Sequence, residues 1–119
     1  MKFLKPFAQK KWSRRENIFL LERLGMYLAA GLALDRAFSA AGDEMSPPRR
    51  QTLESIRNSI EQGGAVSSAL HEQVGISSTI ASLIRHGELS GELPKTLNMG
   101  RRLMEKVDAL IRKCLSSLA

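Results

Sequence analysis

Features that many enzymes and secreted proteins need are scarce or missing in this sequence. Only one cysteine is present, Cys114, so no internal disulfide can form and a reducing compartment is the default expectation. There is no paired-cysteine zinc pattern, no phosphate-binding Gly-x-x-x-x-Gly-Lys loop and no Gly-x-Ser-x-Gly motif. The sequence therefore lacks the signatures of several large classes of enzyme.

Long apolar runs are missing as well. The longest stretch without a charged residue, Gln73 to Ile84, has 12 residues, and four of them carry hydroxyl groups. A membrane-spanning helix needs about 20 mostly apolar residues. No apolar run follows the lysines near the N-terminus, as it would in a secretory signal. The sequence predicts neither a membrane span nor a signal peptide in this chain.

Aromatic residues make up only 5% of the chain, and the aliphatic residues are mostly Leu, Ile and Ala, which favours helix over sheet. A length of 119 residues, with 43% hydrophobic and 25% charged residues, is typical of one globular domain with a single core. The expected fold is all-α.

Helical periodicity, together with glycine and proline stops, predicts a bundle of six helices with short glycine-containing corners and a long C-terminal helix. The expected helices run from a capping box at Ser13 and Glu16 to Gly31; from Leu34 to Ala41, closed by Gly42; from Ser46-Pro47-Pro48 to Gly63-Gly64; from about Ser67 to Gln73, closed by Gly75; from Ser77 or Ser78 onward; and from about Leu93 towards Leu118. The expected core includes Leu28, Leu53, Ile56, Leu83, Leu97 and Val107.

Acidic residues are absent from the first fifteen positions, which hold Lys2, Lys5, Lys10, Lys11, Arg14 and Arg15. Residues 16–119 have twelve basic and twelve acidic side chains, so all of the net charge of +6 falls in residues 1–15. This predicts a basic, flexible tail over residues 1–15 and a neutral helical domain over residues 16–119. The tail also contains Phe3, Leu4, Phe7 and Trp12, a mixture that suits an anionic membrane surface or a phosphate backbone. A solvated leader without a partner is the alternative.

Groups that could perform catalysis or bind a metal are few. His71 and His86 are expected at the surface or at helix ends, and Cys114 is expected to be a small core residue. Glu88 and Glu92 are four residues apart, but a turn between them makes paired acid–base chemistry a poor interpretation. The chain is therefore interpreted as non-enzymatic, with no catalytic residues, no cofactor and no metal site.

The stretch from Arg85 to Leu97 holds two glycines and two acids between two segments of helical periodicity. Gly87 or Gly91 can reverse the chain at positive φ, where a Cβ would clash. Glu88 and Glu92 would then lie near the start of the next helix, where the helix dipole favours negative charge. A helix–turn–helix corner with capping acids is the plainest interpretation.

Three motifs in this sequence resemble a known family. The residues Gly87, Glu88, Ser90, Gly91, Leu93 and Leu97, in this spacing, resemble the signature of the cytoplasmic domains of the type II secretion F-protein family. The segment with Gly31, Leu34 and Ala37 is similar to the family's Ala-Gly-Leu-Pro-Leu-x-x-Ala-Leu corner, and the segment from Gly63 to Leu70 is similar to its second such corner. Together they cover about residues 18–115. Ala33 stands where the family often has proline, and Pro94 stands where the family seldom has proline. These two departures affect the geometry at helix starts, not the pattern of the motifs.

The resemblance implies a function without catalysis. Members are polytopic inner-membrane platform proteins of type II secretion and type IV pilus machines, which implies a helical bundle that self-associates and docks other machine components. The implied partners are further copies of the chain, the cytoplasmic assembly ATPase and other inner-membrane assembly proteins, at the cytoplasmic face of the bacterial inner membrane. In that family the last helix leads into a transmembrane segment, so the chain is expected to be truncated before one.

A basic, helical nucleic-acid-binding domain is the alternative function. The basic tail supports it, because phosphate contacts come from Lys and Arg. The neutral body and the lack of a helix with several basic or amide side chains on one face speak against it. The interpretation as a platform protein therefore includes no nucleic-acid partner.

Overall fold

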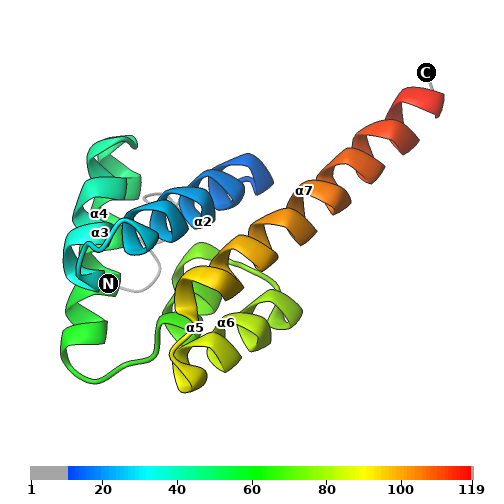
Figure 1. The fold of residues 1–119 in the computed structure, drawn as a ribbon. Helices are drawn as coiled ribbons and strands as arrows, with labels where there is room; N and C mark the ends of the chain where they lie inside the picture. Colours follow the sequence, from blue (N-terminus) through cyan, green and yellow to red (C-terminus); the bar gives the residue numbers. More distant parts are fainter. Residues whose placement is uncertain (1–10, 119) are drawn as a thin grey trace.

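The computed structural model describes residues 11–118, and this part of the chain forms six α-helices and no strand (Figure 1). The helices are α2 (Arg14–Ala29), α3 (Leu34–Asp43), α4 (Pro47–Glu61), α5 (Val66–Ala69), α6 (Ser78–Ser90) and α7 (Leu93–Leu118), and α5 continues as a π-helical turn, η2 (Leu70–Val74). The prediction of an all-α fold with six helices and a long last helix is confirmed.

Helices α2 and α7 lie antiparallel and form the centre of the molecule. Arg14 at the start of α2 contacts Asp108 in α7, whereas a side chain at Gly25, near the end of α2, would touch Pro94 and Leu97 at the start of α7. Helix α6 packs against α7 as well, and α3 and α4 form a hairpin beside α2. In Figure 1, α7 runs on beyond the other helices towards the C-terminus.

The core is made of aliphatic side chains and two aromatic residues, Trp12 and Phe38. Its fully buried side chains include Leu20, Leu21, Leu24, Phe38, Leu53, Ile56, Leu70, Ile84 and Leu97. Such spacing of apolar residues gives each helix one buried face. This core holds the helix corners described below in place.

The local signals for helix ends are confirmed. Ser13 accepts a hydrogen bond from the Glu16 amide, and the Glu16 carboxylate accepts one from the Ser13 amide, which completes the capping box. Ser77, rather than Ser78, caps α6. Helix α7 begins at Leu93, so Pro94 lies in the first turn, where no intrahelical bond is lost.

Two glycines that were expected near helix ends lie inside helices instead. Gly42 was expected to close the second helix, but α3 continues to Asp43, and Gly42 is buried where a Cβ would come within 3.2 Å of the Arg50 side chain. Of the two candidates for the later turn, Gly91 has the positive φ, and Gly87 is helical. A glycine that permits close packing and a glycine that permits a turn look alike in a sequence.

The expected core is confirmed at Leu53, Ile56 and Leu97. Leu28 and Leu83 are half-buried at its edge. The predictions for Val107 and Cys114 are wrong, because Val107 is 44% exposed and the Cys114 side chain is exposed. Val107 lines an open groove described below, and Cys114 lies on the last turns of α7, which run on beyond the other helices in Figure 1.

Helix α2 and the contacts of the residues just before it extend the helical domain to positions before residue 16, its expected start. Trp12 is buried, the Lys11 carbonyl accepts a hydrogen bond from Arg49, and Arg14 is the first residue of α2. The expectations for residues 1–10, which include Lys2, Lys5 and Lys10, lie outside the residues that the structure describes.

Candidate interaction surfaces

The corner between α6 and α7 depends on the absence of a side chain at Gly87. A Cβ at this position would lie 1.9 Å from Thr96 Oγ1 and 2.8 Å from Thr96 Cβ, far inside van der Waals contact. Thr96 itself is buried, and its hydroxyl donates to the Leu93 carbonyl at 3.1 Å. Gly87 therefore lets α6 approach the first turn of α7 closely.

Glu88 joins this corner to a third helix. Its carboxylate accepts a hydrogen bond of 2.6 Å from the Val66 amide and one of 3.0 Å from the Ser67 amide, at the start of α5. Unpaired amides at a helix start are satisfied by such an acceptor, and the negative charge complements the helix dipole. The expectation that Glu88 lies near the start of the following helix is wrong, since it lies within α6 and caps a helix more than twenty residues upstream.

The other motif residues complete the turn. Gly91 has φ +77°, and its amide and the Glu92 amide both donate to the Gly87 carbonyl. Leu97 is fully buried, Leu93 is partly buried against the core, and Ser90 is exposed. The structure thus brings the motif residues together in one corner, which gives α5, α6 and α7 their relative positions.

The two upstream corners share one local conformation. Gly31 has φ +97° and Gly63 has φ +98°, and each is followed by an extended residue, Ala33 or Ala65, that precedes a new helix. Leu34 is partly buried, and Ala37 is fully buried in the core. These corners reverse the chain and bury the start of the next helix, so their residues are also structural.

An apolar groove lies between the start of α2, the start of α6 and the middle of α7. It encloses about 420 Å³, and its walls include Ile76, Ile80, Leu103, Met104 and Val107. Leu103 and Val107 are 41% and 44% exposed, which is high for branched aliphatic side chains in the middle of a helix. Helical spacing alone did not locate this groove, because it requires three segments that meet only in the folded chain.

Four polar side chains also line this groove, those of Arg14, Asn17, Ser77 and Thr79. Asn17 is only 6% exposed, and its Oδ1 atom has no hydrogen-bond partner. Leaving a buried acceptor unpaired costs about 1–3 kcal/mol. This atom has almost no exposed surface, so its lack of a partner is a cost within the fold itself.

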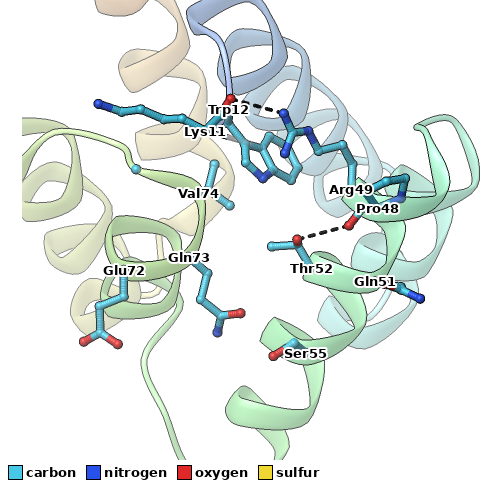
Figure 2. A pocket seen from close by; sticks show the side chains of 11 residues that line it. Lys11, Trp12, Pro48, Arg49, Gln51, Thr52, Ser55, Glu72, Gln73 and Val74 are labelled. Atoms are coloured by element: carbon cyan, nitrogen blue, oxygen red, sulfur yellow. Dashed lines mark hydrogen bonds between the residues drawn. The ribbon is translucent and has the colours of Figure 1, made fainter. Parts of the chain in front are cut away.

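A second, polar cleft of about 650 Å³ separates α4 from the η2 turn (Figure 2). Arg49 lies at one end of it, where its guanidinium stacks over the Trp12 ring and pairs with Glu16 at 2.8 Å. The remaining lining is polar, with Thr52, Ser55 and Gln73 among its residues. In this cleft Arg49 joins the N-terminal segment to α4, which is a structural task.

Asp108 connects the start of α2 to α7. Its carboxylate pairs with Arg14 and with Arg112, each at 3.1 Å. The hydrogen bond from Arg14 lowers the pKa of Asp108 below its ordinary value, and the charge of Arg112 acts in the same direction. The expected contact residue Arg14 is thus half-exposed and tied to Asp108, while Lys11 and Arg15 are exposed.

The groups considered for chemistry do not assemble into a reactive centre among residues 11–118. His71 contacts the Ile76 carbonyl through Nδ1, His86 is exposed on α6, and Cys114 is exposed on α7. The same residues contain no group of three or more His, Cys, Asp or Glu that could hold a metal ion. The motif residues of this chain build helix corners instead.

The motif-built corners and the open apolar groove belong to an all-α helical bundle. Residues 20–119 match the family model described as type II secretion system (T2SS), protein F. The chain therefore belongs to this family, as its motifs predicted. The family is one of inner-membrane platform proteins of secretion and pilus machinery that have cytoplasmic domains. A comparison with curated proteins gave no match.

No helix within residues 11–118 combines the length and the apolar composition that crossing a membrane requires.

Proposed function

We propose that this domain is a non-enzymatic assembly module of a type IV pilus or type II secretion platform, which acts through protein contacts at the cytoplasmic face of the bacterial inner membrane. Its membership in the protein F family supports this proposal. Its partners would be a second copy of the chain, the cytoplasmic assembly ATPase and other inner-membrane assembly proteins.

The apolar groove is the observation that carries the proposal. Exposed Leu103 and Val107 line it together with buried Ile76 and Ile80. Apolar surface of this kind is stabilised when a partner covers it.

The first partner to test is a second copy, because self-association needs only the purified chain. We expect a weak dimer, since a groove of this size offers less than the surface buried in a standard, stable interface. Sedimentation equilibrium at high micromolar concentration should detect this dimer. A Val107→Asp variant should shift it to monomer, because the new charge would be buried without a partner.

Leu89→Asp is the matched control. Leu89 is 73% exposed on α6 and does not line the groove, so the same charge there should leave the dimer intact. In cells, Val107→Asp should abolish pilus or secretion assembly, and Leu89→Asp should not. If the unchanged chain is entirely monomeric, self-association is refuted. If cells with a well-folded Val107→Asp variant assemble normally, the role of the groove in assembly is refuted.

A further inference from the structure

The charge of the folded chain is segregated in a way that the linear sequence hides. Residues 16–100 have seven basic and ten acidic side chains, a net charge of −3. Residues 101–118 have five basic and two acidic side chains, a net charge of +3, and Lys11, Arg14 and Arg15 add another +3. The ion pair between Arg14 and Asp108 shows that these two basic segments lie side by side. We name them together the basic end.

Most charges of the basic end are available to a partner. The side chains of Arg15, Arg102, Lys106 and Lys113 are exposed and form no ion pair within residues 11–118. The two acids are already neutralised, because Asp108 pairs with two arginines and Glu105 pairs with Arg101 at 2.6 Å. The basic end therefore presents a surplus of cations.

An apolar stripe runs between these cations on the far half of α7. Leu110, Leu115 and Leu118 are 62%, 61% and 83% exposed. Because successive helix residues turn by about 100°, these leucines share one side of the helix, with Lys106 and Lys113 along one edge and Arg112 along the other. A helix with an apolar face flanked by Lys and Arg is the kind that lies in the interface of a lipid bilayer.

The charge decides between the candidate partners of this surface. A second copy meeting it face to face would bring two surfaces of like charge together, which is unfavourable. An anionic bilayer offers both negative headgroups for the cations and an apolar layer for the leucines. The family is one of inner-membrane proteins, so such a bilayer is near its cytoplasmic domains.

We propose that the basic end binds anionic lipid headgroups, with the leucines of the far half of α7 inserted at the interface. This surface adjoins the apolar groove, which Arg14 and Val107 line, and extends beyond the contacts expected of residues 1–15. It would fix the orientation of the domain on the membrane and leave the acidic body turned towards protein partners.

The test measures binding of the full 119-residue chain to vesicles. Vesicles of phosphatidylcholine mixed with phosphatidylglycerol should bind the chain, vesicles of phosphatidylcholine alone should bind it weakly, and added salt should reduce the difference. Removing one basic residue near an anionic surface lowers the binding constant about fivefold, so Lys106→Gln with Lys113→Gln should lower it about 25-fold. Leu115→Ser with Leu118→Ser should also weaken binding.

Arg36→Gln with Arg85→Gln is the matched control. Both arginines are exposed, but they lie in α3 and α6, in the acidic part of the chain, so their loss should change vesicle binding less than about twofold. Equal losses in the two double variants would overturn the proposal, since net charge alone would then explain binding. Binding of duplex DNA without binding of vesicles would overturn it too. Lys106 and Lys113 do not line the groove, and dimerisation is measured without vesicles, so a dimer that persists in the variant Lys106→Gln with Lys113→Gln distinguishes failure of one proposal from failure of the other.

Discussion

Leu97 and Leu115 occupy the same side of the same helix but have opposite environments. They are 18 residues apart, which is five turns of an α-helix. Leu97 is fully buried beside Gly25 of α2, whereas Leu115 is 61% exposed on the far half of α7. Apolar periodicity therefore predicts which side of a helix is apolar, whereas the fold determines whether another helix covers that side.

The largest expected effect tests this comparison directly. Leu97→Ala should lower the free energy of unfolding by about 3 kcal/mol, because it removes a buried side chain and leaves a cavity. Leu115→Ala should change it by less than about 0.5 kcal/mol, as exposed substitutions do. Urea unfolding of both variants measures the difference. Similar losses would mean that the far half of α7 is packed in solution.

The close approach at Gly87 should be the next most sensitive point. Gly87→Ala would place a Cβ on Thr96, so we expect a loss of about 2 kcal/mol in the free energy of unfolding. Adding Thr96→Ala removes the nearest atom and should recover part of that loss. The same denaturant titration provides the measurement, and a tolerated alanine would show that α6 and α7 can separate without cost.

A substitution of Glu88 tests the hydrogen bonds of the corner between α6 and α7, whereas a substitution of Gly87 tests its packing. Glu88→Ala leaves the amides of Val66 and Ser67 without their acceptor, which should cost about 1–2 kcal/mol. Hydrogen exchange should speed up most at the start of α5. Glu92→Ala is the control, because the Glu92 side chain contacts only the exposed Lys95, at 3.9 Å. Equal exchange in the two variants would remove the capping role.

Much of the fold follows from local chemistry that the sequence displays. The capping box at Ser13, the prolines at the start of α4 and the glycines with positive φ each act within a few residues, so the helices and their order were predictable. The role of Gly42 was misjudged, and the sequence could not choose between Gly87 and Gly91, because admitting a neighbouring helix depends on tertiary packing.

The candidate surfaces were harder to predict from the sequence. The groove, the capping of α5 by Glu88 and the basic end each join segments that are distant along the chain. Counting charges along the sequence gave a neutral body, yet the antiparallel pairing of α2 and α7 gathers the cations at one end. The burial of Trp12 likewise depends on Arg49 in α4, whose position no local pattern encodes.

The smallest expected effect concerns Asp108, which lies where the packed and the unpartnered parts of α7 meet. Pairing with Arg14 and Arg112 lowers the pKa of Asp108, so the folded state binds its proton less readily than the unfolded state does. Its stabilising contribution is present above the ordinary value of 3.8 and is lost as the pH falls through the lowered pKa. Asp108→Asn should therefore be slightly less stable than the unchanged chain at neutral pH, and the two should converge in acid.

Glu16 also contributes to the dependence of stability on pH in acid, and a substitution of Glu16 supplies the control for Asp108→Asn. Its pKa is lowered by the hydrogen bond from Arg49, with a further contribution from the Ser13 amide, so it too loses its contribution as the pH falls from about its ordinary 4.5. Asp108→Asn should flatten only part of the pH dependence, and Glu16→Gln should flatten another part. Urea unfolding from neutral to acid pH separates them. If Asp108→Asn shows the full pH dependence of the unchanged chain, the ion pair between Asp108 and Arg14 does not persist in solution. Residues 101–118 of α7 would then be held to α2 by apolar contacts alone.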